Sequence, residues 1–165
     1  MIAVVDYGVG NLYSLTCSLR HIGAQCTVTR EENALRAADR IILPGVGAFG
    51  DAMSHLKEYQ LIQTIYDVVE KKTPFLGICL GLQLLFERSD ESRGVNGLGI
   101  LPGEIVEIPS APGLKIPHMG WNSLNITPGS RLFKGIEKNP YVYFVHSYYL
   151  KAGRPSDVAA KTWYS

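Results

Sequence analysis

The chain has 165 residues, of which 46% are hydrophobic and 19% are charged, and its net charge is +1. This length fits one domain. A chain of this size buries about two thirds of its unfolded surface when it folds. The balanced charge, without a basic stripe or an acidic tail, argues against a nucleic-acid partner and against disorder. We therefore expect a small-molecule ligand.

The three cysteines, Cys17, Cys26 and Cys79, are an odd number and include no C-x-x-C pair. This pattern favours neither a disulfide framework nor a zinc site, and it indicates a reducing compartment. The N-terminal segment has no basic stretch of the kind that opens a signal peptide, and no apolar run is long enough to span a membrane. We expect a cytoplasmic protein with no membrane partner, no metal and no cofactor.

The first half of the chain predicts alternating strands and helices. A β-branched run at 2–5 precedes a glycine-rich turn and a helix with leucines at helical spacing, for which Asn11 is the expected N-cap and Gly23 the expected stop. Strands are expected at 24–29, possible as a sheet edge, at 40–44 and from Pro74, with helical segments at 31–39, 51–56 and 61–69 between them. This order predicts an α/β fold with a doubly wound, mainly parallel sheet and helices on both faces.

The second half of the chain has a different pattern. Residues 87–97 are polar and predict a loop, and from Gly103 onward short β-prone runs are separated by prolines. The most strongly β-prone run is 140–149, and a last strand is expected at 158–164. These runs predict antiparallel strands in the C-terminal part.

The most informative stretch runs from Pro74 to Gln83 and places Cys79 between Gly77 and Gly81. This spacing fits the nucleophile elbow, a sharp strand-to-helix turn in which glycines allow close backbone approach. The amides and the positive dipole end of a helix that begins at the elbow favour the thiolate form of Cys79. Gln83 lies one helical turn beyond Cys79 on the same face of that helix. A plainly packed cysteine is the simpler alternative. Cys79 and Gln83 together favour an acyl-transfer site.

A second glycine-rich loop, Gly45-Val-Gly-Ala-Phe-Gly50, follows the third strand. Taken alone, it is as typical of a tight turn as of a ligand site. Active sites of parallel sheets lie beyond the carboxyl ends of the strands, where this loop and the elbow both fall. We therefore expect the loop to present backbone amides to an oxyanion.

Five segments together resemble the class I glutamine amidotransferases, and within that family the glutaminase subunits of imidazole glycerol phosphate synthases. They are Asp6-Tyr-Gly-Val-Gly-Asn11, Leu43-Pro-Gly-Val-Gly47, Gly77-Ile-Cys-Leu-Gly-Leu-Gln83, Pro117-His-Met-Gly-Trp-Asn122 and Tyr143-Phe-Val-His-Ser-Tyr148. The resemblance covers the whole chain and implies one amidotransferase domain over residues 1–165. It also implies that L-glutamine is hydrolysed and that the ammonia passes to a (βα)₈ barrel synthase subunit of histidine biosynthesis.

The resemblance implies roles for individual residues. Cys79 would attack the side-chain amide of glutamine and form a glutamyl thioester. The oxyanion would be met by the amide of Leu80 and by a loop amide, for which Val46 and Gly47 are the candidates. The residues expected to bind the substrate are Gly45, Gln83, Glu91, Ser147 and Tyr148. The residues expected to face the partner are Asn11, Met119, Trp121, Asn122 and Tyr143, with core packing as the alternative for Trp121.

The sequence departs from the family in one respect. The family's triad is completed by a His-x-Glu motif, and none of the histidines at 21, 55, 118 and 146 is followed two residues later by glutamate. His146 is a tempting base for Cys79, but it matches a different family motif. We therefore expect the 165 residues to lack the C-terminal end of the domain and its histidine and glutamate. The alternatives are a non-catalytic binding module and a class I glutaminase that serves a different synthase.

Overall fold

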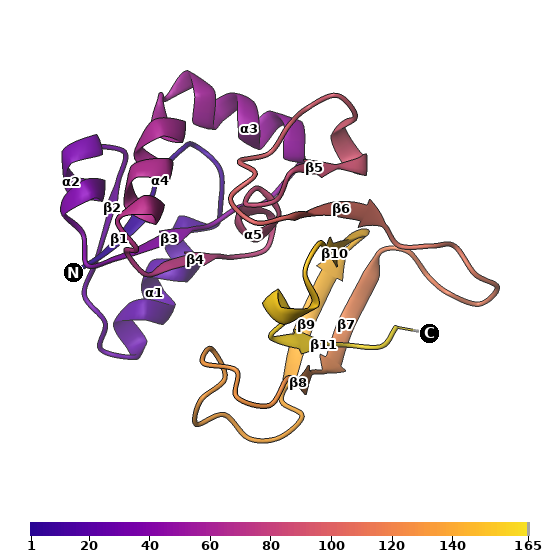
Figure 1. Cartoon of the computed structure of the whole chain (residues 1–165). Helices are drawn as coiled ribbons and strands as arrows, with labels where there is room; N and C mark the ends of the chain where they lie inside the picture. The colour runs from indigo at the N-terminus through magenta and orange to yellow at the C-terminus, as the bar shows by residue number, and fades with distance from the viewer. Residues whose placement is uncertain (165) are drawn as a thin grey trace. The chain divides into compact units, whose positions relative to one another are not determined.

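The computed structural model describes residues 1–164 and contains two compact units, one over Met1–Leu101 and one that begins at Pro102. The colour gradient of Figure 1 runs from the first unit, in indigo to magenta, to the second, in orange to yellow.

The first unit is built on a four-stranded parallel sheet. Its strands are β1 (Ile2–Val5), β2 (Cys26–Thr29), β3 (Arg40–Leu43) and β4 (Phe75–Gly77), in the order β2-β1-β3-β4. The predicted strand at 24–29 is β2 and lies at an edge, as its mixed pattern suggested. The β-branched runs of β1 and β3 are largely buried, which is typical of parallel strands covered on both faces.

Helices cover both faces of this sheet (Figure 1). They are α1 (Leu12–His21), α2 (Glu32–Ala37), α3 (Phe49–Glu58), α4 (Leu61–Glu70) and α5 (Leu80–Gln83). On one face, Leu19 of α1 packs against Val4 and Ile42. In Figure 1, α2 and α4 lie on the opposite side of the sheet from α1. The predicted α/β arrangement is therefore confirmed.

The limits of α1 follow from local chemistry. The side-chain oxygen of Asn11 accepts a hydrogen bond from the Ser14 amide at 3.1 Å, which satisfies one of the free N–H groups of the first turn. Gly23 has a φ of +74°, a conformation that glycine adopts at little cost and that ends the helix. Both predicted boundaries are confirmed.

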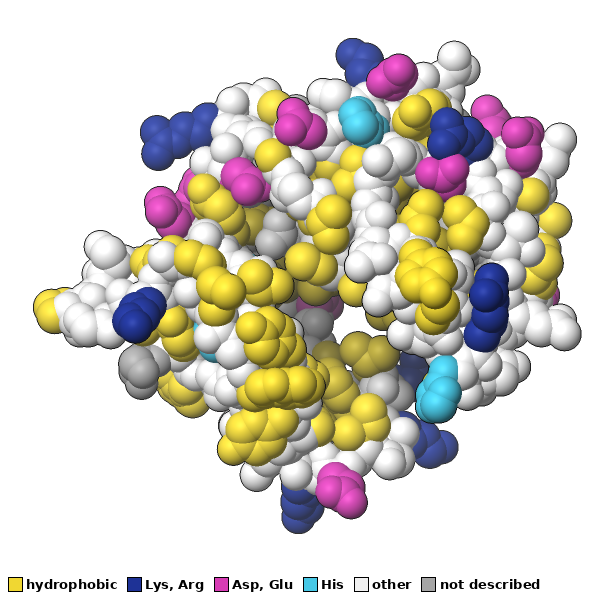
Figure 2. Space-filling model, turned by 180° about the vertical axis from the view of Figure 1, so that it is seen from behind, with side chains coloured by type: hydrophobic (Ala, Val, Ile, Leu, Met, Phe, Trp, Pro, Cys, Tyr) yellow, Lys and Arg dark blue, Asp and Glu magenta, His cyan; other side chains and the backbone are white. Residues whose placement is uncertain are grey.

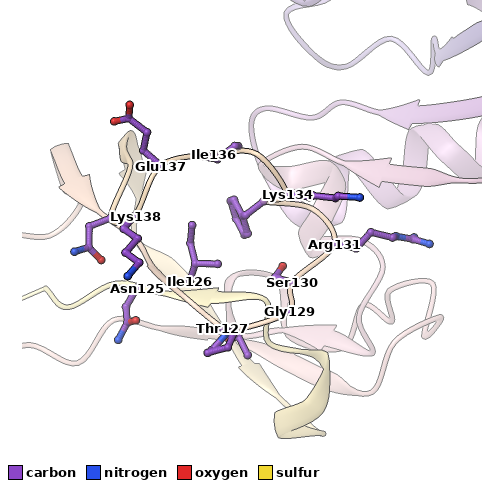
Figure 3. Close-up of a pocket in the computed structure, with 13 residues that line it drawn as sticks. Asn125, Ile126, Thr127, Gly129, Ser130, Arg131, Lys134, Ile136, Glu137 and Lys138 are labelled. Atoms are coloured by element: carbon purple, nitrogen blue, oxygen red, sulfur yellow. The ribbon is translucent and has the colours of Figure 1, made fainter.

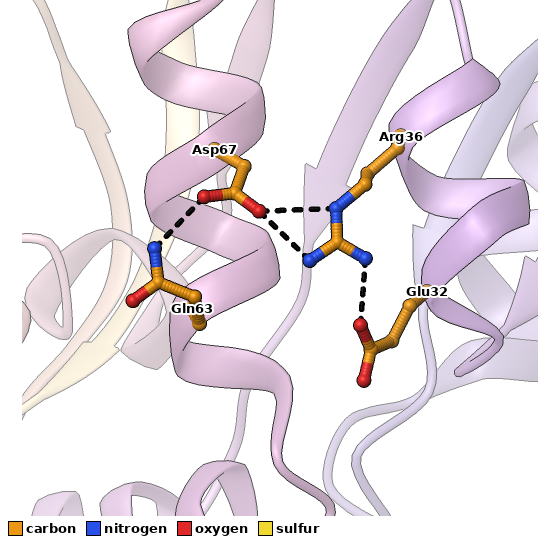
Figure 4. A network of polar contacts seen from close by, with 4 residues as sticks. All are labelled: Glu32, Arg36, Gln63 and Asp67. Carbon is orange, nitrogen blue, oxygen red and sulfur yellow. Dashed lines mark hydrogen bonds and ion pairs between the residues drawn. The ribbon is translucent and has the colours of Figure 1, made fainter.

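A polar network joins α2 to α4 (Figure 4). Arg36 donates two hydrogen bonds to one carboxylate oxygen of Asp67, at 3.0 and 2.7 Å, and a third to Glu32 at 2.6 Å. Gln63 donates to the other oxygen of Asp67 at 2.8 Å. The hydrogen bonds from Gln63 and Arg36 lower the pKa of Asp67 below its usual range. The network fixes these two short helices side by side.

The predicted loop at 87–97 contains short ordered elements. These are β5 (Arg88–Ser89) and the 3₁₀ turn η1 (Asp90–Ser92). The Ser89 hydroxyl caps η1 by accepting a hydrogen bond from the Glu91 amide at 3.2 Å. The turn places Glu91 and Ser92 against the start of α3.

The second unit contains antiparallel pairs of strands, as predicted. β6 (Gly103–Glu107) pairs with β10 (Tyr148–Ala152), β7 (His118–Ser123) with β9 (Tyr141–His146), and β8 (Asn125–Ile126) with β11 (Ala160–Lys161). A 3₁₀ turn, η2 (Pro155–Asp157), precedes β11.

The last predicted strand, 158–164, is wrong in length, because only Ala160–Lys161 pair as a strand. The partner β8 offers only two residues. Beyond them, the Thr162 hydroxyl donates to the Ser123 carbonyl and the Tyr164 ring stacks on His118, so the chain makes side-chain contacts instead of a longer ladder.

Candidate active site around Cys79

The turn at Cys79 has the strained geometry of a nucleophile elbow. Cys79 has φ 54° and ψ −117°, lies between β4 and α5, and is exposed. A non-glycine residue in such a conformation costs on the order of 1–3 kcal/mol and persists only when its surroundings enforce it. The Cys79 carbonyl accepts from the Leu82 and Gln83 amides at 3.0 and 3.2 Å, which ties the turn to the helix that follows.

The glycines on either side of Cys79 are required by close backbone packing. A Cβ atom at Gly81 would lie 1.9 Å from the Leu43 carbonyl oxygen, and a Cβ atom at Gly77 would lie 2.6 Å from the Leu82 Cα. Neither distance leaves room for a side chain. The G-x-C-x-G spacing is therefore the sequence signature of a turn in which Gly77 packs against the backbone of α5 and Gly81 against the end of β3.

The helix after the elbow is shorter than the apolar run through Phe86 suggests. α5 ends at Gln83, and Leu84 to Phe86 continue in turns. Four residues sum fewer aligned peptide dipoles than a full helix does. Gln83 is half-buried at the end of α5, one turn beyond Cys79 as predicted.

The loop after β3 runs alongside the start of α5. A Cβ atom at Gly45 would lie 2.6 Å from the Gly81 nitrogen and 2.9 Å from the Leu80 Cβ. Val46 is 52% exposed, and Gly47 has a φ of +89°. The structure thus brings Gly45, which opens the predicted loop, next to Leu80, the first residue after the cysteine.

The upstream end of this loop is held by a residue that the sequence analysis did not single out. The Tyr7 hydroxyl donates a hydrogen bond to the Pro44 carbonyl at 2.7 Å, and Tyr7 is completely buried. Burial raises the pKa of Tyr7 far above its usual range, and negative charge at Cys79 raises it further. The sequence signals for Tyr7 were its place in the turn after β1 and in the family segment Asp6-Tyr-Gly-Val-Gly-Asn11, neither of which pointed to Pro44.

The downstream end of the loop is held by the segment at 91–92. One carboxylate oxygen of Glu91 accepts from the Phe49 amide at 2.8 Å, and the Ser92 hydroxyl accepts from the Gly50 amide at 2.9 Å. These bonds cap the first turn of α3. Glu91, predicted from the sequence as a substrate ligand, thus also has a helix-capping contact, and the importance of Ser92 was missed.

Ser147 and Tyr148 belong to the second unit. The Ser147 carbonyl accepts from the Ile108 amide at 2.9 Å, and Tyr148 is the first residue of β10. His146 donates from Nδ1 to the Tyr148 carbonyl at 2.7 Å. Its Nε2 is buried and has no hydrogen-bond partner among the described residues, and its ring contacts those of His118 and Phe144.

One face of the β7–β9 ribbon exposes large hydrophobic side chains. Met119 is 62% exposed and Trp121 69%, and the latter lies opposite Tyr143 with its ring edge-on at 5.6 Å between centroids. Trp121 is therefore not a core residue of this chain. Exposed hydrophobic side chains, yellow in Figure 2, form a continuous patch on part of the face shown there.

The other two predicted partner-facing residues differ from these three. Side chains alternate along a strand, so Asn122 lies on the opposite face of the ribbon from Trp121. The Asn122 amide group donates to the Trp163 carbonyl at 2.6 Å. Asn11 is exposed in the first unit, where it caps α1.

Two cavities lie outside the elbow itself. One of about 330 Å³ in the first unit borders the 46–48 loop; it is lined by Val9, Val46, Gly47, Ala48, Asp51, Ala52, Ser54 and His55. Another of about 710 Å³ in the second unit is formed by residues 125–139 and contains none of the predicted site residues. In Figure 3 the side chains of Arg131 and Lys134 point away from it, so their charges do not face the cavity.

Residues 1–164 contain no group of three or more histidine, cysteine, aspartate or glutamate side chains placed to hold a metal ion. In the same range, none of the helices combines the length and the apolar character needed to cross a membrane.

Comparison with known proteins relates this geometry to a family. The sequence profile of the family described as glutamine amidotransferase class-I matches residues 3–164. The imidazole glycerol phosphate synthase subunit HisH of a Cyanothece species is 50% identical over 159 residues, which are 96% of this chain and 74% of that protein. The subunit HisH of Methanothermobacter thermautotrophicus is 51% identical over an alignment of 166 positions, which covers 99% of this chain and 80% of that protein.

Solved structures agree on the fold. A crystal structure of a glutamine amidotransferase matches with a TM-score of 0.75 at 17% identity, covering 98% of this chain and 80% of that one. The PurLQS structure from Thermotoga maritima matches with a TM-score of 0.68 at 19% identity, covering 99% and 74%. With the family profile and relatives about half identical over nearly the whole sequence, this chain belongs to the class I glutamine amidotransferases, in the family of the imidazole glycerol phosphate synthase subunit HisH.

Proposed function

We propose that this protein is the glutaminase subunit of an imidazole glycerol phosphate synthase and that Cys79 is its nucleophile. The observation that supports the choice of Cys79 is the elbow. There, an exposed cysteine at φ 54° lies between two glycines, and neither glycine position has room for a side chain. The relatives of the HisH family support the substrate and the pathway.

The proposed reaction has two stages. The Cys79 thiolate attacks the side-chain carbonyl carbon of L-glutamine, and the negative charge collects on the carbonyl oxygen. The amide of Leu80 and that of Val46 or Gly47 donate to this oxyanion. The intermediate then breaks its C–N bond, the nitrogen takes up a proton and leaves as ammonia, and a glutamyl thioester remains. Water attacks the thioester and releases glutamate and the thiolate.

Several residues are proposed to bind the amino-acid end of glutamine. They are Gly45, Gln83, Glu91, Ser147 and Tyr148. Glu91 is compatible with this role although it caps α3, because an ionised carboxylate accepts several hydrogen bonds and one of its oxygens receives the Phe49 amide. Its second oxygen is the proposed acceptor for the substrate ammonium group.

We do not assign the general base to His146. Its Nδ1 is engaged with the Tyr148 carbonyl, and its Nε2 is buried among aromatic rings of its own unit. These contacts support a structural role for His146. The proposal that a histidine and a glutamate of a His-x-Glu motif complete the triad rests on the family resemblance.

The partner is proposed to be a (βα)₈ barrel synthase subunit, which forms a heterodimer with this protein. The synthase subunit is proposed to receive the ammonia directly from the glutaminase. The exposed apolar face of Met119, Trp121 and Tyr143 supports a contact of this kind, because patches of large apolar side chains mark interaction surfaces. Asn11, in the first unit, and Asn122 are also proposed to face the partner. Three free cysteines support a reducing, cytoplasmic location.

The replacement Cys79→Ala tests the assignment. In the complex with the synthase subunit, it should abolish glutamate release from L-glutamine and leave synthesis from ammonium salts unchanged, because the nucleophile serves only to release ammonia. Cys17→Ala, which removes a half-buried thiol on α1, is the control and should change neither reaction. Retained glutamine hydrolysis in Cys79→Ala would overturn the proposal.

A further inference from the structure

We infer that Tyr7 is a positioning residue for glutamine hydrolysis: its buried hydroxyl fixes the Pro44 carbonyl and thereby sets the place of the loop amide that receives the oxyanion. This inference rests on the proposed function, because it takes the 45–48 loop to supply one of the oxyanion donors.

The contact that fixes Pro44 joins distant parts of the chain. Tyr7 lies two residues beyond the end of β1, and its hydroxyl donates to the Pro44 carbonyl, one residue beyond the end of β3, at 2.7 Å. Pro44 is also close to the backbone of Gly10, since a Cβ atom there would lie 3.1 Å from the Pro44 Cβ. The turn after β1 thus holds the first residue of the loop after β3.

The hydroxyl lies where the loop and the elbow meet. A Cβ atom at Gly45 would lie 2.8 Å from the Tyr7 hydroxyl oxygen and 2.6 Å from the Gly81 nitrogen. A shift of the Pro44 peptide would therefore pass directly to Gly45, and from there to the Val46 amide and the start of α5. The backbones of Gly45 and Gly81 are too closely packed to absorb such a shift without moving.

The loop is held at its other end by Glu91 and Ser92, which accept from the Phe49 and Gly50 amides at 2.8 and 2.9 Å. With both ends held, the positions of the intervening amides depend on the two anchors. Oxyanion donors act best when they are preorganised, because no reorganisation is then needed during the reaction. Supporting hydrogen bonds of this kind keep a site within about 0.5 Å of its productive geometry.

Tyrosine suits this place better than phenylalanine would. A ring alone would fill the same space and leave the Pro44 carbonyl without its donor. A tyrosine hydroxyl is protonated at neutral pH, and burial, with negative charge at Cys79 adding to it, raises the pKa of Tyr7 further, so the hydroxyl stays a donor in alkaline solution too. The hydroxyl is thus explained by its hydrogen bond and not by ring packing.

The test compares Tyr7→Phe with Tyr66→Phe in the complex with the synthase subunit. Tyr66 is a matched control because its hydroxyl also donates to a backbone carbonyl, that of Leu98, at 2.7 Å and in the same unit. Loss of a direct oxyanion donor costs about 10²–10³ in kcat. Because Tyr7 acts through the loop, we expect a fall of about 10-fold in kcat with KM for L-glutamine within about 3-fold, and no change in Tyr66→Phe.

A second measurement depends less on turnover. Labelling of Cys79 by 6-diazo-5-oxo-L-norleucine, whose ketone oxygen needs the oxyanion donors, should slow about 10-fold in Tyr7→Phe. Labelling by iodoacetamide, which has no such need, should change less than 2-fold. Peptide mapping assigns each adduct to its cysteine. Amide exchange at Val46 and Gly47, measured on the same proteins, should quicken in Tyr7→Phe alone.

The outcomes separate the inference from the function it rests on. If Cys79→Ala abolishes hydrolysis but Tyr7→Phe matches Tyr66→Phe in kcat and in labelling, the positioning role is wrong and the function stands. If iodoacetamide labelling slows as much as labelling by the ketone, Tyr7 acts on the thiol and not on the loop, which also overturns the inference. If Cys79→Ala retains hydrolysis, the proposed function fails first.

Discussion

Gly81→Ala tests whether close packing of the elbow against β3 sets the catalytic geometry. The backbone at Gly81 is not left-handed, so helix propensity alone would favour alanine by about 0.5–1 kcal/mol. The added Cβ, however, would lie 1.9 Å from the Leu43 carbonyl oxygen and 2.7 Å from the Leu43 carbonyl carbon. Both atoms are backbone, so β3 and the elbow must separate by about 1 Å, since Cβ contacts below 3.0 Å are essentially absent from proteins.

The size of the effect differs between stability and activity. Overpacking of this kind costs about 1–3 kcal/mol of unfolding free energy. A misplacement of about 1 Å in an active site costs on the order of 10²-fold in rate. Because Leu43 leads directly into the 45–48 loop, we expect kcat for glutamine hydrolysis to fall by about 10²-fold, well beyond what the lost stability explains.

Gly97→Ala is the matched control. Its Cβ would lie 2.2 Å from the Phe86 carbonyl oxygen, again a backbone clash in the first unit but one that does not involve β3. Urea unfolding gives the stability of each variant, and glutamate release in the complex with the synthase subunit, under conditions where all variants are folded, gives kcat. If both variants lose the same stability and the same activity, the placement of β3 against the elbow does not control the reaction.

Three further predictions concern other parts of the chain. Asn11→Ala should lower the unfolding free energy by about 1 kcal/mol, because it removes the N-cap of α1. Asn11→Ser should lower it by much less, since serine is also a good N-cap. Equal losses for the two variants in urea unfolding would show that the cap of α1 contributes little. Burial, and then positive charge on His146, lower the pKa of His118, so below about pH 6.5 the unfolded chain binds a proton before the folded one does. The unfolding free energy should therefore fall as pH decreases from 6.5, and His118→Phe should flatten this slope; an unchanged slope would contradict the assignment. Trp121→Ala should weaken binding of the synthase subunit by about 2 kcal/mol or more, measured by calorimetry. Tyr13→Ala, which replaces an exposed residue on α1, is the control and should change the affinity little. If Trp121→Ala leaves the affinity unchanged and lowers the thermal stability, Trp121 has a structural role instead.

Local rules in the sequence were enough for the parallel sheet and for the elbow. Buried β-branched runs alternating with amphipathic helices leave few other arrangements for the first hundred residues, and Asn11 and Gly23 mark helix limits through bonds and angles within a few residues of themselves. Gly77 and Gly81 could be read in advance as sites of close approach, because glycine is needed wherever a backbone leaves no room for Cβ. The family resemblance added the substrate and the reaction.

Only the tertiary structure decided which residues meet across the sheet. The hydrogen bond from Tyr7 to Pro44 spans 37 positions, and those from Phe49 and Gly50 to the 91–92 turn span 42, so no local pattern announces them. The shortness of the last strand likewise depended on its partner, since β8 offers only two residues for pairing. Long-range contacts of this kind depend on where the sheet brings the ends of separate strands, and the sequence of each segment carries no record of its neighbours in space.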